Sequence, residues 1–205
     1  QCGYGVAATP ERVALGAPFD DAAGANAGAV WIYELGPTGW SFDAKVSPSD
    51  AAADDQFGAA LSLSGEWLLV GAPRDGDQGY LSGSAYLFRR TAPGAWVEVQ
   101  KLLPSDGVAP ARFGASVALS GTSALIGAPY QFSTSFGTGA AYSFELGANG
   151  WEQLQKLNAD DATSGDLFGH SVALDGIDAV VGAPLDDAAL VDAGSAYIFR
   201  RALDG

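Results

Sequence analysis

Acidic side chains are the residues of this chain best suited to chemistry, because they recur in loop-like segments. The chain has 205 residues, 24 of them acidic and 10 basic, and a formal net charge of −14. Ca²⁺ prefers carboxylate and carbonyl oxygens in flexible loops, so these segments are candidates for a calcium site. The candidate ligands are Asp20, Asp21, Asp75, Asp77, Asp186, Asp187 and Asp192. A second acidic set comprises Asp50, Asp54, Asp55, Asp106, Asp160, Asp161 and Asp166. Asp also favours turns, and an acidic rim keeps a protein soluble, so both interpretations stay open.

Catalysis has little support in the sequence. The single histidine, His170, would need a nucleophile and an orienting acid. Ser171 and Asp175 are near in sequence, but adjacent residues of a strand point to opposite faces. The sequence shows no second histidine, no cysteine cluster and no phosphate-binding Gly-Lys loop. We therefore expect no catalytic residues and no enzyme, with His170 as a loop residue.

Charge and hydropathy exclude two kinds of partner. Phosphate binding needs a basic face, which ten cations among 24 acidic residues do not readily supply, so nucleic acid is not expected. No apolar run reaches the ~20 residues that span a bilayer, so the chain is not expected to cross a membrane. The single cysteine, Cys2, allows no internal disulfide. It is expected either as a small buried apolar residue or in an intermolecular disulfide.

Three markers recur with one period and define a repeat. Gly-Ala-Pro begins at Gly16, Gly71, Gly127 and Gly182, spaced by 55, 56 and 55 residues. Phe-Gly precedes three of these copies by 13 residues, and Cys2-Gly3 holds its place in the first. Trp followed five residues later by Lys is the third marker, as at Trp96 and Lys101. The residues expected to have a structural role in the repeat are Phe57, Gly58, Phe113, Gly114, Phe168, Gly169, Gly16, Pro18, Gly71, Pro73, Gly127, Pro129, Gly182 and Pro184.

Each repeat predicts four strands. In the third repeat they cover residues 115–119, 124–126, 140–144 and 151–157, with a tight turn at Ser120-Gly121. The first strand has small residues, which suits a crowded axis, and the Trp-to-Lys strand is polar, as expected for an outer edge. We therefore predict an all-β fold, a β-propeller of four blades with about four antiparallel strands each, the last lacking its outer strand. The four blades are expected to form either a small ring or an arc of a larger one. A β-sandwich would not explain four equal copies. The prediction is one domain over residues 1–205, with repeats at 1–55, 56–111, 112–166 and 167–205.

These motifs resemble the FG-GAP repeat, which builds the propeller of integrin α subunits and occurs in many secreted bacterial proteins. The resemblance implies that the Phe-Gly and Gly-Ala-Pro segments pack between neighbouring blades. It also implies an extracellular or cell-surface location. Two departures stand out: integrin propellers have seven blades, and their Asp-x-Asp-x-Asp-Gly calcium loop is replaced here by short turns such as Ser64-Gly65. The integrin calcium site is therefore not carried over.

The segments after Gly-Ala-Pro differ between repeats, and variable loops on a constant scaffold are where specificity usually resides. They run from Phe19 to Gly28, Arg74 to Gly83, Tyr130 to Gly139 and Leu185 to Gly194. Their unrepeated aromatic residues are candidates for ligand binding: Phe19, Tyr80, Tyr130, Phe132 and Phe136. We expect a non-enzymatic binding or adhesion module for a protein or glycan. The alternative is a structural self-assembly unit, in which strand donation between chains completes the last blade.

Overall fold

The structure consists of four antiparallel β-sheets. It is a computed structural model and describes residues 2–132, 137–187 and 190–202. The first sheet contains β1 (Val6–Ala8), β2 (Arg12–Ala17), β3 (Ala29–Gly36) and β4 (Gly39–Val46). The second contains β5 (Ala60–Ser64), β6 (Trp67–Ala72), β7 (Ser84–Ala92) and β8 (Ala95–Leu102). The third contains β9 (Ser116–Ser120), β10 (Ser123–Ala128), β11 (Ala140–Gly147) and β12 (Gly150–Leu157). The fourth contains β13 (Ser171–Asp175), β14 (Asp178–Ala183) and β15 (Ser195–Arg200).

Each sheet is a propeller blade built in chain order. Strands pair with their sequence neighbours, so the Trp-to-Lys strands β4, β8 and β12 are outermost, as the sequence predicts. The tight turns of the second, third and fourth sheets depend on glycine, because Gly65, Gly121 and Gly176 adopt positive φ values of 57°, 58° and 57°. The fourth sheet has three strands within the described residues, which confirms the predicted incomplete blade.

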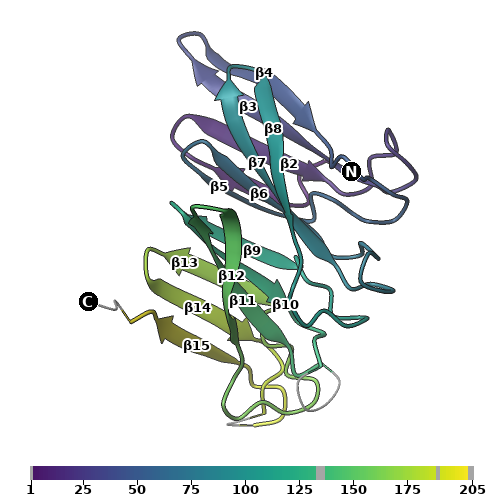
Figure 1. The fold of residues 1–205 in the computed structure, drawn as a ribbon, viewed down its shortest axis with the longest axis vertical. Coiled ribbons are helices and arrows are strands. Elements are labelled where there is room, and N and C mark those ends of the chain that lie inside the picture. The colour runs from purple at the N-terminus through teal and green to yellow at the C-terminus, as the bar shows by residue number, and fades with distance from the viewer. Residues whose placement is uncertain (1, 133–136, 188–189, 203–205) are drawn as a thin grey trace.

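The blades follow one another along an arc. Strand β1 contacts β5, β5 contacts β9 and β9 contacts β13, so the first strands of the blades line a common axis. Figure 1 shows the first and fourth sheets at opposite ends of this arc. Among the residues that the structure describes, one face of the first blade and one face of the fourth therefore have no neighbouring blade.

Phenylalanine from each Phe-Gly segment fills the space between two blades. Phe57 is fully buried, and its ring meets those of Tyr86 and Phe88 edge-on, with centroids 5.4 and 5.8 Å apart. Its backbone forms a parallel bridge with Gly28 of the preceding blade. Phe113 and Phe168 repeat this arrangement with the aromatic pairs of β11 and β15. The two aromatic residues of β7, β11 and β15 therefore serve packing between blades, whereas Trp31 and Tyr33 of β3 contact Phe42 of their own blade.

Glycine in the Gly-Ala-Pro segments allows the blades to approach closely. A Cβ atom placed on Gly16 would lie 1.9 Å from the carbonyl oxygen of Gly58 in the next blade. Gly71 and Gly127 stand in the same relation to Gly114 and Gly169, at 1.9 and 2.0 Å. No side chain fits such a gap, so these positions require glycine.

Cys2 is exposed, so the expectation of a buried residue is wrong. It lies on the uncovered face of the first blade, where it borders a pocket with Trp31 and Tyr33. The equivalent Phe57 is buried because the first blade covers it. No described blade covers Cys2 in this way.

Candidate functional site

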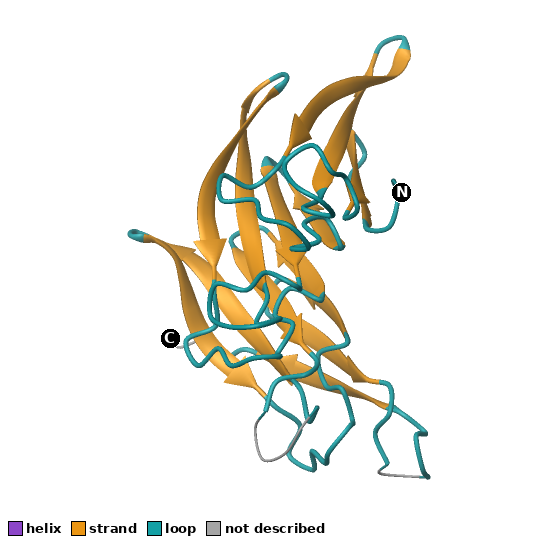
Figure 2. Ribbon diagram, turned by 90° about the vertical axis from the view of Figure 1, so that its right-hand side faces the viewer, coloured by secondary structure: helices purple, strands orange, loops and turns teal. Residues whose placement is uncertain are grey.

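The loops that join second and third strands lie at one edge of the blades. Figure 2 shows long loops gathered along this edge, away from the short hairpin turns at the tips of the sheets. The Phe-Gly segments reach the same edge, because Gly58 donates a backbone hydrogen bond to Gly71 at the end of β6. The repeat therefore places its variable segments beside its most constant ones.

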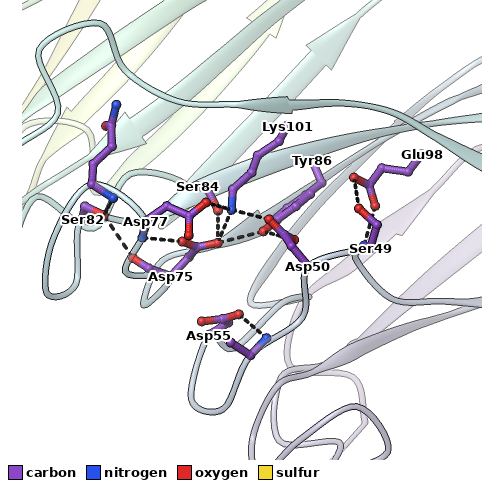
Figure 3. Close-up of polar contacts among 12 residues, drawn as sticks. Ser49, Asp50, Asp55, Asp75, Asp77, Ser82, Ser84, Tyr86, Glu98 and Lys101 are labelled. Carbon is purple, nitrogen blue, oxygen red and sulfur yellow. Dashed lines mark hydrogen bonds and ion pairs between the residues drawn. The ribbon is translucent and has the colours of Figure 1, made fainter.

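The second repeat has a cluster of charged residues at this edge (Figure 3). The Nζ atom of Lys101 lies 2.7, 2.8 and 2.6 Å from carboxylate oxygens of Asp50, Asp75 and Asp77. The Tyr86 hydroxyl lies within hydrogen-bond distance of Asp50 and Asp75, at 2.9 and 2.7 Å. Lys101 thus supplies the positive charge that allows three carboxylates to lie together. We refer to Asp50, Asp75, Asp77, Tyr86 and Lys101 as the Lys101 cluster.

Asp75 is the buried acid of this cluster. Burial alone would raise its pKa, but hydrogen bonds from Lys101, from the backbone of Asp77, and from Tyr86 and Ser84 outweigh burial and lower it. The pKa of Lys101 is raised: burial lowers it, and the hydrogen bonds to Asp50, Asp75 and Asp77 more than compensate. Burial raises the pKa of Tyr86 as well, so the phenol stays protonated and can donate.

A one-residue register shift directs the lysine toward the cluster. In the pairing of β7 with β8, Leu87 faces Gln100 and Phe88 faces Glu98, so the register is shifted by one residue. Beyond the shift Lys101 lies opposite Tyr86, and its Nζ is 5.1 Å from the centroid of that ring. The first and third sheets have equivalent shifts, which place Lys45 opposite Trp31 and Lys156 opposite Tyr142. A β-bulge re-aims side chains in this way.

The other repeats have variants of the cluster. Lys45 pairs with Asp20 at 2.8 Å in the first repeat, and Lys156 pairs with Asp106 at 2.6 Å in the third. In the fourth, the Tyr197 hydroxyl lies 2.7 Å from Asp161 and 2.6 Å from Asp186. The chain has three lysines, all in the first three repeats. The fourth repeat therefore combines the acids and the tyrosine without a lysine.

The candidate metal ligands divide between two kinds of position. Asp75 and Asp77 lie with Asp50, which belongs to the second acidic set, and oxygens of the three are within 4.8 Å of one another. This spacing is close enough to hold a metal ion, although Lys101 already contacts all three. Asp21 and Asp187 instead accept backbone hydrogen bonds from Asn26 and Asp192 and so shape their own loops.

The aromatic candidates are dispersed. Tyr80 is 76% exposed and borders the pocket beside the Lys101 cluster. Phe19 packs edge-on against Tyr4, with ring centroids 6.0 Å apart. Phe132 is 42% exposed, and Phe136 lies outside the described residues. Among the four candidates that the structure describes, Tyr130 borders a pocket that several blades share.

That pocket lies at the loop edge close to the propeller axis and has a volume of about 370 Å³. Three sets of equivalent positions line it: residues after Gly-Ala-Pro, residues before Phe-Gly and residues after Phe-Gly. Arg74 and Tyr130 belong to the first set, Gln56 and Arg112 to the second, and Tyr4 and His170 to the third. We refer to it as the axial pocket. It draws on all four repeats and contains the single, exposed histidine.

The sequence itself matches a known repeat. A model of the FG-GAP repeat matches residues 40–88, 96–144 and 151–199, which together make up more than half of the chain. The chain belongs to the FG-GAP repeat family. Each matched segment of this FG-GAP chain begins at the outer strand of one blade and ends in the third strand of the next.

Solved structures support the fold of the FG-GAP chain. It is similar to the crystal structure of Saccharomyces cerevisiae Sqt1, with a TM-score of 0.53 and 10% identity. The match covers 90% of this chain and 43% of that one, so the FG-GAP chain spans less than half the length of the protein it matches. At this identity the likeness concerns the fold alone. Among curated proteins, no sequence matches the chain. Within the described residues, the structure has no helix long and apolar enough to cross a membrane.

Sequence reasoning missed two features of the FG-GAP chain. It did not join Asp50 and Lys101 to Asp75, although acids at Asp50, Asp106 and Asp161 keep the period of the repeat. It also assigned no role to Arg74 and Arg112. The sequence contains a signal for their proximity: Arg74 directly follows Gly-Ala-Pro, and Arg112 directly precedes Phe-Gly. Because these two segments are expected to pack together, the residues beside them are expected to lie close to one another.

Proposed function

We propose that this FG-GAP chain is a non-enzymatic binding module that recognises a protein or glycan outside the cell or at its surface. The axial pocket is the observation that supports the proposal most directly. It lies at the edge where the variable loops gather, and it is formed by residues from four blades. Its volume of about 370 Å³ lies at the lower end of the range of ligand pockets.

The composition of this edge also favours binding over catalysis. Aromatic side chains combined with a few polar groups are typical of recognition surfaces. His170 lines the axial pocket, and no Asp or Glu among the described residues lines that pocket with it. A rigid set of blades that presents variable loops suits adhesion, because the scaffold keeps the loops in place.

The binding proposal can be tested with arrays. Labelled protein is applied to arrays of glycans and of extracellular protein domains, and each hit is repeated with Tyr80→Ala and Tyr130→Ala. We expect both variants to weaken the signal at the same hits. Trp40→Ala is the matched control, because Trp40 is an exposed aromatic residue, 50% accessible, on the outer strand of the first blade. An absence of hits, or equal loss in the control, would contradict the proposal.

Strand donation between chains is the second candidate, and the fourth blade favours it. Strand β15 pairs with β14 along one side and has no partner on the other within the described residues. Beside it runs a groove lined by Leu154, Leu174, Ile177 and Phe199. Asp161, Asp186 and Tyr197 match the acids and tyrosine that receive Lys101 in the second blade. An added strand carrying a lysine would complete this arrangement.

A peptide tests strand donation. The peptide copies residues 150–157, the outer strand of the third blade, and the control peptide replaces its lysine with methionine. We expect the first peptide to raise the melting temperature of the protein and the control to raise it less. Light scattering over a range of concentrations provides the second measurement. A strict monomer that neither peptide stabilises would rule out assembly by this route.

A further inference from the structure

The arginines that lack an acidic partner identify a binding site in the axial pocket. Seven of the ten cationic side chains form ion pairs. Among the described residues, the remaining three, Arg74, Arg89 and Arg112, make no ion pair. Arg74 and Arg112 border the same pocket, and no Asp or Glu borders it with them. This grouping of unpaired positive charge is unexpected in a chain with a net charge of −14.

The fold restrains Arg112 through its backbone and through a neighbouring ring. Arg112 has a φ of 53°, and Gln56 and Leu167, which also precede Phe-Gly, have φ values of 58° and 58°. The blade junction thus imposes the left-handed conformation at this position of the repeat. The Arg112 guanidinium lies over the ring of Tyr130, 4.6 Å from its centroid. A cation–π contact of this kind restrains the position of the guanidinium.

Arg74 carries a buried donor without an acceptor. Its Nε atom is buried and has no hydrogen-bond partner among the described residues. A buried donor is normally paired, so Arg74 can take an oxygen acceptor from a ligand or from water. The Nε atoms of Arg12 and Arg90 also make no hydrogen bond among the described residues, but these two arginines form ion pairs, and Arg74 forms none. The guanidinium group has five N–H donors and no acceptor, so it is matched by a group with several acceptor oxygens, and a carboxylate is the partner that gives the strongest hydrogen bonds.

We propose that the axial pocket binds the carboxylate of an acidic residue in a peptide segment, through Arg74 and Arg112. The inference rests on the proposed binding function and names the chemistry that this edge recognises. Planar guanidinium groups bind carboxylates in a two-point geometry, and such hydrogen bonds are stronger than neutral ones. Tyr4 and His170 lie at the same pocket and add polar groups around the bound carboxylate.

The surroundings select against ligands with dense negative charge. A second pocket shares Arg74 with the axial pocket and is lined by Asp50, Asp54, Asp55, Asp75 and Asp77. These carboxylates repel sulfated glycans and nucleic acids, whose charges are closely spaced. A peptide with a single acidic residue places one charge in the axial pocket and none beside the acids. The site therefore favours an isolated carboxylate.

The test uses a capped pentapeptide with one central glutamate and the same peptide with glutamine. Binding to the full chain is followed by NMR, through the arginine side-chain signals and those of His170. We expect the glutamate peptide to bind about tenfold more tightly, because hydrogen bonds to a charged group replace those to a neutral one. Arg74→Gln and Arg112→Gln should each remove most of this preference. Arg89→Gln is the matched control, because it removes the same charge from an exposed position on β7.

Each contrary result has a distinct meaning. Equal binding of the two peptides, or equal loss in the Arg89 control, would overturn the carboxylate site. If glucuronate binds to the axial pocket and the glutamate peptide does not, the assignment to a peptide is overturned. A sulfated oligosaccharide that binds more tightly than the peptide would overturn the preference for a single charge. If array hits persist in the Arg74 and Arg112 variants, this inference fails and the proposed binding function stands.

Discussion

The ammonium groups of all three lysines form ion pairs with aspartate carboxylates. Lys45, Lys101 and Lys156 also lie over the ring of an aromatic residue on the neighbouring strand, 4.9, 5.1 and 5.6 Å from its centroid. Removing charges from water is costly, and paired charges with further hydrogen bonds recover that cost. The acids at this edge are therefore held in place by lysines that belong to the repeat.

Replacement of Lys101 should destabilise the protein through Asp75. In Lys101→Met the buried carboxylate of Asp75 loses its counterion while Asp50 and Asp77 remain close. We expect a loss of about 2 kcal/mol at neutral pH, below the cost of breaking a fully buried pair because Asp50 and Asp77 are partly exposed to solvent. Urea unfolding measures the change. Arg89→Met is the control, since Arg89 forms no ion pair among the described residues, and an equal loss in both would contradict this account.

The pH dependence of that loss has a definite sign. The pKa of Asp75 is lowered in the folded protein, so its contribution to stability is present above the unfolded value of about 4 and disappears as the pH falls through the folded value. In Lys101→Met burial remains without the ammonium, and the pKa of Asp75 should rise. The stability difference between the two proteins should therefore shrink between pH 7 and about pH 4. A difference that is constant over this range would show that the loss is not electrostatic.

Calcium should bind once the lysine is removed. The oxygens of Asp50, Asp75 and Asp77 lie within 4.8 Å of one another, a spacing that suits a cation with oxygen ligands. We expect calcium to raise the melting temperature of Lys101→Met and to have a much smaller effect on the wild-type protein. The double variant Lys101→Met, Asp77→Asn should lose most of the gain. A gain that the double variant retains would place the calcium elsewhere.

The sequence predicts only part of the Lys101 cluster. Asp75 and Asp77 were identified as candidate ligands because they lie close together in one loop. Asp50 and Lys101 come from two other segments, and a bulge in the pairing of β7 with β8 sets the direction of the lysine. The sequence of a single repeat contains no signal that predicts this bulge. The polar pattern around Lys101 predicts an exposed edge strand, and the strand is at the edge, but the lysine itself turns inward.

Elements were more predictable than side-chain partners. The period places the tight turns at Gly65, Gly121 and Gly176, and all three adopt positive φ. The predicted strand at 124–126 is longer in the structure, as β10 (Ser123–Ala128), because it continues into Gly-Ala. Periodicity identifies strands by their hydrophobic residues, so a strand end made of glycine and alanine gives a weak signal.

Gly-Ala-Pro glycines should tolerate no side chain. In Gly71→Ala the new Cβ would lie 1.9 Å from the carbonyl oxygen of Gly114, a backbone atom that moves only with its blade. We expect a loss of about 3 kcal/mol, at the upper end of the costs of overpacking. Gly36→Ala is the matched control, because its nearest neighbour is 3.8 Å away and it should change stability by less than about 0.5 kcal/mol. Urea unfolding of both variants measures the difference, and similar losses would contradict the close approach.

At the scale of the molecule, the four blades form a short linear array. Blades two and three have neighbours on both sides, whereas the first and fourth each leave one face uncovered. Ile198 is 79% exposed and Val180 is 40% exposed on the fourth blade, and Val6 is 65% exposed on the first. In such arrays, stability depends on the interfaces between nearest neighbours.

Hydrogen exchange should reveal this arrangement. We expect the slowest exchange in β6, β7, β10 and β11, which belong to the two central blades, and the fastest in β13, β14 and β15. Native-state exchange measured by NMR or mass spectrometry resolves these strands. Uniform protection across all four blades would show that the chain unfolds as a single unit. The comparison of β10 with β14 is the sharpest, because they occupy equivalent positions in neighbouring blades.

The arc itself was only partly predictable. Four equal repeats imply blades, but they do not state whether the blades close into a ring. The curvature arises from contacts such as that between Gly16 and Gly58, and a sequence pattern does not give their angles. The axial pocket depends on the same curvature, because it brings together equivalent positions of different repeats.

The Lys101 cluster also has a mechanical consequence. It joins Asp50, in the segment that enters the second blade, to Lys101, in the strand that leaves it. A force that pulls the two ends of the second blade apart must therefore break the ion pairs of Lys101 before it separates the paired strands. The fourth blade has the equivalent acid and tyrosine, Asp161 and Tyr197, but no lysine of this chain pairs with them. Under load, the fourth blade should open first and the second should hold longest.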